Sequence, residues 1–295
     1  MTIVACAICG GMRTRRLYTK SGYDIGRCDR CGLVYATPRA PRDTILARYS
    51  GDYFWKEYLP ALGVLDGSYD LTQFDVRYAP LLELLGPACG RRLLEIGCGA
   101  GFFLKSAERR GWRVEGIEFS EEASRFGREQ LGLEIRQQQA ETMTIAPATF
   151  DAVVMFDTIE HLFDPRVALI SIARALVPGG WLLISTPNFR ALSRRLLGSS
   201  WAVLSPLEHM YYFDADTLGR LVEDCGFVGV RFVHQNPAWT TQETMNFVHT
   251  HTPRSMRARL AALIGRVGGY PLARGVQRIG RQDILLCLAR RTERA

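Results

Sequence analysis

The stretch that decides the fold covers residues 92–101 and reads Arg92-Leu93-Leu94-Glu95-Ile96-Gly97-Cys98-Gly99-Ala100-Gly101. Its branched apolar residues are typical of a strand buried on both faces of a parallel sheet. The three glycines let the backbone turn sharply and approach a ligand where a Cβ would collide. Residues 102–110 then read as a helix that Gly111 ends. Strand, glycine turn and helix together predict a nucleotide-type binding corner.

The glycine spacing distinguishes between classes of nucleotide ligand. A dinucleotide fingerprint is G-x-G-x-x-G, whose third glycine allows tight packing of helix on strand. Phe102 stands in that third position here, and the pattern is instead E-x-G-x-G-x-G, beginning at Glu95. About twenty residues further on, a second strand over residues 114–119 contains Glu118, whose carboxylate can accept both hydroxyls of a ribose. A purely structural turn is the alternative interpretation.

On these residues the chain resembles the first half of a class I S-adenosylmethionine-dependent methyltransferase. The resemblance continues in chain order. A fourth strand is expected at residues 150–157, and a helix end, a turn and a fifth strand at 176–187. A last helix follows at 214–226, a sixth strand at 227–233 and an antiparallel seventh strand at 281–290. It implies an α/β fold: a Rossmann-like, seven-stranded, mostly parallel sheet with helices on both faces. The alternation of strands and helices leads to the same sheet.

The resemblance also implies S-adenosylmethionine as cofactor. The residues it assigns to cofactor binding are Glu95, Gly97, Gly99, Gly101, Glu118, Phe119, Ala140, Glu141 and Phe156. The family usually has an acid beside the adenine where this chain has Gln139. Because glutamine can still hydrogen-bond the adenine amine, the departure weakens that one assignment only.

Four cysteines near the start predict a zinc site. They form two C-x-x-C-G knuckles, Cys6 with Cys9 and Cys28 with Cys31. Each knuckle can place two thiolates on one metal, and four sulfurs complete a tetrahedral, structural site with no open position for catalysis. Disulfides are disfavoured without a signal peptide, and no thioredoxin-like strand precedes either pair. Zinc would stabilise a module too small to have its own core.

We expect three parts in the chain: a zinc ribbon over residues 1–38, a linker and helical cover over 39–85, and the methyltransferase domain over 86–295, with an insertion near 239–280. The aromatic-rich stretch 49–58 either covers the cofactor and acceptor or simply packs in the core. An amphipathic stretch at 255–267 fits a lid, a dimer surface or a membrane-surface helix.

Composition fits an ordinary globular protein of 295 residues, with 47% apolar residues. We see neither a signal peptide nor an apolar run of membrane-spanning length, and we expect a cytoplasmic protein.

The net charge of +7 comes from the end of the chain, because residues 251–295 hold ten arginines against Asp283 and Glu293. This basic tail either contacts phosphates or is a solvated helix face.

The loop after the fourth strand carries the candidate chemistry. Ligands of open α/β sheets bind at the carboxyl ends of the strands, where Asp157, Glu160 and His161 lie in this sequence. The run resembles the E-H-x-x-x-P signature of small-molecule methyltransferases such as the ubiquinone-pathway O-methyltransferases. His161 is a candidate general base for an acceptor hydroxyl, with Glu160 or Asp157 fixing its tautomer. Asp164 is expected to cap the next helix.

A second polar pair, Glu208-His209, extends this candidate catalytic set to His161, Glu160, Asp157 and His209. In some relatives acids and histidines at similar places hold a divalent cation. A Mg²⁺ ion bound by these four side chains is therefore the alternative to base catalysis.

Together these features resemble methyltransferases of sugar, polysaccharide and natural-product pathways, and the resemblance implies methyl transfer to a small-molecule hydroxyl. The alternatives are C- or N-methylation, an RNA methyltransferase with a zinc-binding head, and a non-catalytic protein that retains the fold. We expect no nucleic-acid partner, because the N-P-P-[YF] motif is absent and the basic charge lies far from the ribbon. Oligomeric state is left open.

Overall fold

The computed structural model describes residues 2–49, 51–65, 67–233 and 280–293. The helix expected at 255–267 and residues 239–279 of the expected insertion lie outside these ranges. Within the described ranges, no helix combines the length and apolarity that crossing a membrane requires.

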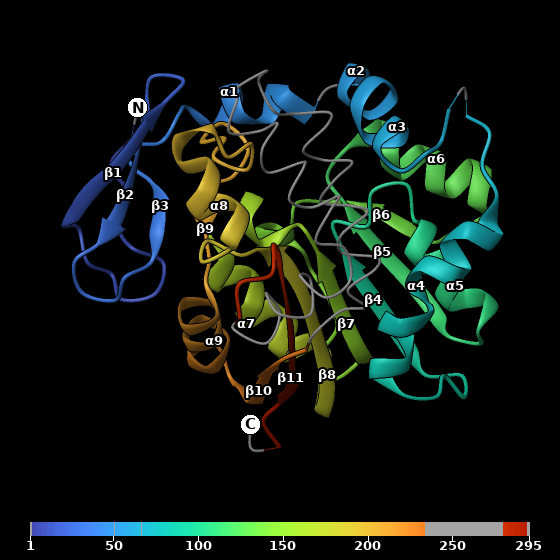
Figure 1. The fold of residues 1–295 in the computed structure, drawn as a ribbon. Helices are drawn as coiled ribbons and strands as arrows, with labels where there is room; N and C mark the ends of the chain where they lie inside the picture. The colour runs from blue at the N-terminus through green and yellow to red at the C-terminus, as the bar shows by residue number, and fades with distance from the viewer. Residues whose placement is uncertain (1, 50, 66, 234–279, 294–295) are drawn as a thin grey trace.

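Seven strands form one sheet in the order β10-β11-β8-β7-β4-β5-β6 (Figure 1). Neighbours from β8 to β6 pair in parallel, whereas β11 is antiparallel to both β8 and β10. This confirms the predicted class, a Rossmann-like, mostly parallel α/β sheet. The strands are β4 (Arg92–Ile96), β5 (Arg113–Glu118), β6 (Ile135–Gln137), β7 (Phe150–Phe156), β8 (Leu176–Pro187), β10 (Phe227–Phe232) and β11 (Ile284–Arg291).

The fifth strand begins immediately after α7. Helix α7 ends at Ala175, with Leu176 as its C-cap, and β8 starts at Leu176, which pairs with Phe150. The expected turn lies near the start of β8, because Gly179 has a φ angle of 72° and the pairing with β7 resumes at Trp181. Before β4, Pro80 lies inside an unbroken α4 (Leu71–Leu85). A proline removes one N–H donor, and Leu81 and Leu82 after it are buried.

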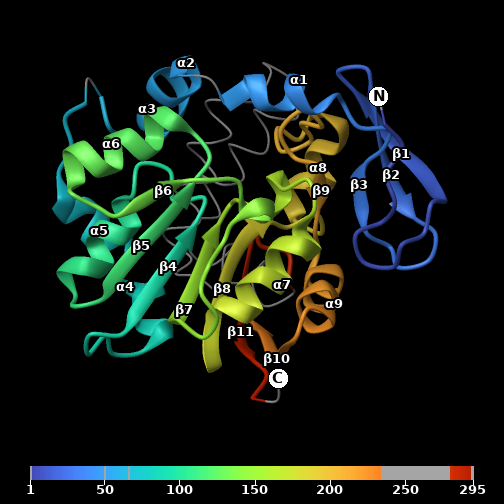
Figure 2. The same cartoon turned by 180° about the vertical axis from the view of Figure 1, so that it is seen from behind.

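Alternating residues of the strands build two cores, one on each face of the sheet. Leu93 packs on the side of α4, α5 and α6, and Leu94 packs on the side of α7 and α9. Helix α4 is on the side seen in Figure 1, and α7 is on the side seen in Figure 2. The remaining bounds are α5 (Phe102–Arg109), α6 (Glu121–Leu131), α7 (Pro165–Ala175), α8 (Leu192–Leu197) and α9 (Ala215–Asp224).

Side-chain caps start the helices that follow the ligand-binding edge. The Ser120 hydroxyl accepts the Ala123 N–H at the start of α6. Asp164 accepts two N–H groups at the start of α7, whose first residue is Pro165. The Asp164 cap was predicted, and both caps satisfy donors that a helix N-terminus leaves free.

The N-terminal ribbon shares a sheet with the main domain. Strands β1 (Thr14–Lys20), β2 (Tyr23–Cys28) and β3 (Val34–Ala36) pair in sequence, and β3 pairs antiparallel with β9 (Tyr211–Tyr212). Buried ribbon side chains, Leu33 and Tyr35 among them, belong to the same core as β7 and β8. The ribbon therefore packs against the main domain and supports the loop that precedes β9.

A chain of short helical turns crosses the carboxyl edge of the sheet, along the top of Figure 1. We call residues 42–49 and 51–61 the strap. It consists of α1 (Arg42–Leu46), a 3₁₀ turn (Ala47–Tyr49), α2 (Gly51–Tyr53), a π-helical turn (Phe54–Tyr58) and α3 (Leu59–Ala61). Further 3₁₀ turns are Ala140–Thr142, Ile159–His161 and Gly198–Ser200.

The two-core arrangement predicts the stability of a matched pair of variants. Ile184 of β8 is fully buried against α7 and α9, whereas Val167 of α7 is 42% exposed. Ile184→Ala should lower the free energy of unfolding by about 2–5 kcal/mol, and Val167→Ala should change it by no more than about 0.5 kcal/mol. Urea unfolding followed by circular dichroism measures both; equal effects would contradict the assignment of this core.

Candidate functional site

The glycine loop between β4 and α5 has no room for side chains. Gly97, Gly99 and Gly101 all have positive φ angles, of 70°, 53° and 86°. A Cβ on each would lie 2.4 Å from Thr158 Oγ1, 1.9 Å from Tyr58 Oη and 2.5 Å from Leu133 Cδ1, respectively. Only glycine tolerates both the positive φ angles and the lack of space for a Cβ. We call the backbone of these three glycines the cradle.

Two acids of the expected cofactor set lie at this cradle. The Glu118 carboxylate accepts the N–H of Gly99 at 2.8 Å and that of Ser120 at 2.7 Å. A carboxylate has about four lone-pair positions, so both oxygens can still accept ribose hydroxyls. Glu95 is 4% exposed, and its Oε2 has no hydrogen-bond partner among the described residues. Burial, followed by the charge of Glu118, raises the Glu95 pKa well above its usual value.

The other expected cofactor residues surround the same corner. Phe119 is half-buried directly after β5, and Ala140 is buried in the turn after β6. The Glu141 carboxylate accepts the Phe163 N–H at 2.6 Å, so it holds the loop after β7. Phe156 packs edge-on against Phe103 of α5, with ring centroids 4.8 Å apart. The glycines, Glu95 and Glu118 fit a nucleoside with a ribose.

The acids after β7 have separate partners. Asp157 adopts a left-handed φ of 45°, and its Oδ1 accepts the Ser185 hydroxyl at 3.0 Å. Glu160 is 1% exposed, and its Oε2 accepts the Thr186 hydroxyl at 2.8 Å. Glu160 Oε1 has no hydrogen-bond partner among the described residues. One carboxylate oxygen is therefore left for a ligand or for a protonated neighbour.

Two histidines face Glu160. His161 Nδ1 lies 2.8 Å from the Tyr49 hydroxyl and 2.9 Å from the Glu208 carbonyl oxygen, and His161 Nε2 lies 3.9 Å from Glu160 Oε1. His209 Nδ1 lies 2.7 Å from the Val203 carbonyl oxygen. A carbonyl only accepts, so Nδ1 carries the proton in each ring and each Nε2 keeps a lone pair.

Electrostatics keep these side chains close to neutral. Burial and then the neighbouring His209 lower the pKa of His161 to about 3. Burial also lowers the pKa of His209. The pKa of Glu160 is raised well above its usual value, first by burial and then by the Asp157 carboxylate. Neutral imidazoles with free Nε2 atoms are proton acceptors and metal ligands.

The structure brings together three of the four predicted catalytic side chains. Glu160, His161 and His209 each offer a ligand atom, and these atoms lie within 4.8 Å of one another. Asp157 is not part of this group, because its carboxylate is bound to Ser185. Sequence reasoning missed the specific roles of Tyr49 and Tyr58, which contact His161 and the glycine loop. The aromatic-rich stretch was the only signal for them.

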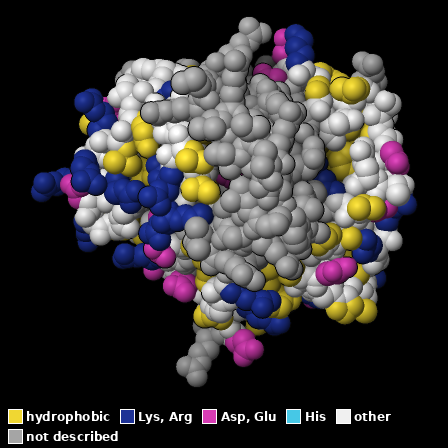
Figure 3. Space-filling view, in the orientation of Figure 1, with side chains coloured by type: hydrophobic (Ala, Val, Ile, Leu, Met, Phe, Trp, Pro, Cys, Tyr) yellow, Lys and Arg dark blue, Asp and Glu magenta, His cyan; other side chains and the backbone are white. Residues whose placement is uncertain are grey.

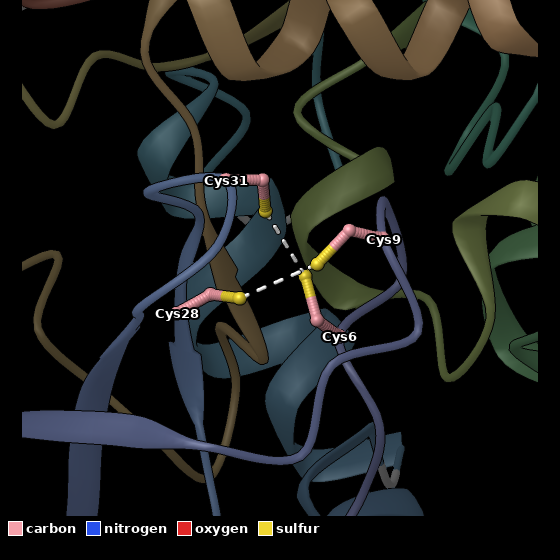
Figure 4. Close-up of side chains that lie close together, drawn as sticks. All are labelled: Cys6, Cys9, Cys28 and Cys31. Atoms are coloured by element: carbon pink, nitrogen blue, oxygen red, sulfur yellow. Dashed lines mark hydrogen bonds between the residues drawn. The ribbon is translucent and has the colours of Figure 1, made fainter.

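The four cysteines of the two knuckles converge (Figure 4). Their sulfurs lie within 4.8 Å of one another, with Cys6 Sγ 3.3 Å from Cys31 Sγ and Cys9 Sγ 3.4 Å from Cys28 Sγ. Zn–S bonds of about 2.3 Å place tetrahedral sulfurs about 3.8 Å apart. The sulfurs therefore fit a zinc ion.

The glycine of each knuckle has the same role. Gly10 and Gly32 have φ angles of 66° and 82°, and their N–H groups donate to the carbonyls of Cys6 and Cys28, respectively. The positive φ required at both positions explains the shared C-x-x-C-G pattern.

Comparison with known proteins shows one family. Residues 71–231 match the sequence model of a family described as a methyltransferase domain. A ubiquinone biosynthesis O-methyltransferase from Dinoroseobacter shibae is 30% identical over 169 residues, which cover 54% of this chain and 68% of that protein. A namesake from Alkalilimnicola ehrlichii is 35% identical over 126 residues, 41% of this chain and 50% of that protein. The matched part of this chain thus spans about half to two thirds of the length of these relatives.

Solved structures share the fold. Phosphoethanolamine N-methyltransferase 2 from Haemonchus contortus, in complex with S-adenosyl-L-methionine, superposes with a TM-score of 0.57 at 17% identity, covering 94% of this chain and 71% of that one. A SAM-dependent methyltransferase from Archaeoglobus fulgidus gives 0.52 at 18% identity, covering 75% and 95%. At these identities the likeness extends to the fold alone.

The cysteine geometry predicts one zinc ion per chain. Cys28→Ser should release the ion, because a hydroxyl replaces one of four thiolates. The ribbon should then become sensitive to proteolysis. Cys89→Ser is the matched control, since Cys89 is exposed and outside the cluster. Metal analysis of protein purified without chelator tests this; a zinc-free wild type would contradict it.

Proposed function

Because the chain belongs to the methyltransferase domain family and is an S-adenosylmethionine-dependent methyltransferase, we propose that it methylates a hydroxyl group of a small molecule in a biosynthetic pathway. Two relatives are named for O-methylation in ubiquinone biosynthesis, which supports oxygen as the accepting atom. Sugars, polysaccharide precursors and natural products are the acceptor classes that we propose to test.

The observation that carries this proposal is the contact between the glycine loop and the loop after β7. Thr158 Oγ1 lies so near Gly97 that a Cβ there would be only 2.4 Å away. Glu160 and His161 follow Thr158 directly. The polar cluster thus adjoins the cradle, as methyl transfer requires, because donor and acceptor must be aligned for an in-line displacement.

When bound, S-adenosylmethionine would supply a methyl group on a positively charged sulfur; the C–S bond would break as the bond to the acceptor oxygen forms, and S-adenosylhomocysteine would leave. The glycine loop, Glu95 and Glu118 would hold this cofactor. His161 Nε2 accepts the proton of the acceptor hydroxyl, and Glu160 Oε1 lies 3.9 Å from the nitrogen that takes it up. The Glu208 carbonyl and the Tyr49 hydroxyl hold Nδ1, so the ring keeps its orientation.

A divalent cation is the second candidate for activating the acceptor. Glu160 Oε1 and the two Nε2 atoms form a set of one carboxylate and two imidazoles, a donor set that transition metals accept. The carbonyls that hold each Nδ1 are the kind of outer partners that orient metal-binding histidines. A cation held there would lower the pKa of the acceptor hydroxyl, and His209 would then be as important as His161.

Basic side chains on the ribbon keep an RNA acceptor as the third candidate. Arg13, Arg15 and Arg16 are exposed, and Figure 3 shows Lys and Arg side chains gathered on the ribbon side of the molecule. The sequence-based argument against RNA considered only the basic charge near the end of the chain. An RNA acceptor predicts binding that weakens steeply with salt, whereas a small acceptor predicts little change.

Cofactor binding should depend on Glu118. Replacing this carboxylate by alanine removes charged hydrogen bonds to the ribose, so Glu118→Ala should weaken S-adenosylmethionine binding by about 1.5–3 kcal/mol. Glu121→Ala is the control, because Glu121 is an exposed residue on the first turn of α6. Isothermal titration calorimetry measures both. Wild-type affinity in Glu118→Ala would refute the assignment.

Turnover should depend on His161. With a panel of hydroxylated acceptors and labelled S-adenosylmethionine, His161→Ala should reduce turnover by about 10²–10⁴-fold, the usual contribution of a general base. Cofactor affinity should change little.

Chelator treatment separates the two ways of activating the acceptor. Under base catalysis a chelator has no effect on turnover and His209→Ala is milder than His161→Ala. Loss of activity with chelator, its return with added Mg²⁺ and equal damage by the two variants would replace the base with a cation. Full activity of His161→Ala would contradict both versions.

A further inference from the structure

The strap touches several of the loops that form the candidate site. Its contacts are spread along its length, from α1 to the π-helical turn. They are an Arg42–Gln139 hydrogen bond, an Arg48–Glu208 ion pair, the Tyr49–His161 hydrogen bond and a hydrogen bond from the Ala100 N–H to the Tyr58 hydroxyl. The strap is thus attached to the glycine loop, to the turn after β6, to the loop after β7 and to the loop that carries His209.

Tyr58 fills the space that Gly99 leaves open. Its hydroxyl oxygen accepts the Ala100 N–H at 3.2 Å. It also lies 1.9 Å from the position that a Cβ on Gly99 would take, and the ring carbon Cζ lies 2.5 Å from it. Burial raises the pKa of Tyr58 well above its usual value, so the group at this position is a neutral phenol. The ring therefore rests directly on the backbone of the glycine loop.

A nucleotide cofactor needs the same space. In dinucleotide-binding corners, which share the order strand, glycine turn and helix, the second glycine lets the ligand approach the backbone closely, and Gly99 is the second glycine of this loop. Given the cofactor role proposed above, we propose that Tyr58 gates the cofactor site. Its phenol leaves Gly99 when S-adenosylmethionine enters, and the cofactor and this position of Tyr58 are mutually exclusive.

The strap is built so that Tyr58 can move while its neighbour stays. Phe54 is 2% exposed, stacks on Tyr58 with centroids 5.6 Å apart, and packs against Phe126 of α6 at 5.8 Å. Tyr58 ends the π-helical turn that Phe54 begins, a rare geometry that is frequent at functional sites. Phe54 thus anchors the turn, whereas the Tyr58 ring is only partly buried against the same core and makes one hydrogen bond to the loop.

The gate predicts whether a substitution of Tyr58 strengthens or weakens cofactor binding. Tyr58→Phe removes the hydrogen bond that favours the closed position. The open fraction then rises, and the apparent dissociation constant falls in proportion. One ordinary hydrogen bond corresponds to about a 2- to 10-fold change. A tyrosine that simply binds the cofactor predicts the opposite sign, because its loss would weaken binding.

Stopped-flow binding of S-adenosylmethionine tests the gate without an acceptor. Trp55 lies on the strap, 49% exposed and 6.1 Å from the Phe126 ring, and reports movement by its fluorescence. In the wild type the observed rate should reach a plateau with rising cofactor concentration, since opening limits it. Tyr58→Phe should raise the plateau and tighten binding about 2- to 10-fold. Trp55→Phe should remove the signal.

Tyr53→Phe is the matched control, because Tyr53 is on the same strap and its hydroxyl makes no hydrogen bond within the described residues. It should bind like the wild type. A rate that rises linearly with concentration, or weaker binding by Tyr58→Phe, overturns the gate while leaving the proposed function intact. Absence of binding by calorimetry, in the wild type and Tyr58→Phe alike, overturns both.

Discussion

The close packing around the glycine loop is the constraint on which the rest of this structure depends. Each of its three glycines is covered by a side chain from a different element: Thr158 from the loop after β7, Tyr58 from the strap and Leu133 from the start of the β6 region. A Cβ at any of the three would displace that neighbour. The loop therefore determines where the candidate catalytic residues lie, because Thr158 is followed directly by the cluster of Glu160 and His161.

The zinc ribbon is part of the same arrangement rather than a separate appendage. Strand β3 of the ribbon pairs with β9, and His209 precedes β9 by two residues. Between them, the Met210 N–H donates to the backbone carbonyl of Glu160 at 2.8 Å. The ribbon thus helps to hold the loop that brings His209 to within 4.6 Å of His161, measured between ring centroids. A four-cysteine ribbon that is remote from the chemistry can support it in this way.

How far the sequence predicted the site follows from the range of the interactions. The cysteine knuckles, the glycine loop and the Asp164 cap depend on residues a few positions apart, so their patterns are visible in the sequence. The Tyr49–His161 contact joins residues separated by 112 positions, and the Arg48–Glu208 pair joins residues separated by 160. Nothing local encodes such pairings. The two-residue strand β9 is likewise too short to leave a pattern, and Asp157 turns to Ser185 because β7 and β8 are neighbours in the sheet.

The central claim is that the space above Gly99 admits either Tyr58 or the cofactor. A crystal structure of the full chain with S-adenosylhomocysteine tests it most directly. We expect the ribose on Glu118, the Tyr58 hydroxyl displaced from the Ala100 N–H, and His161 still within reach of Glu160. A nucleoside bound to the glycine loop with Tyr58 unmoved, or bound elsewhere on the chain, would contradict it.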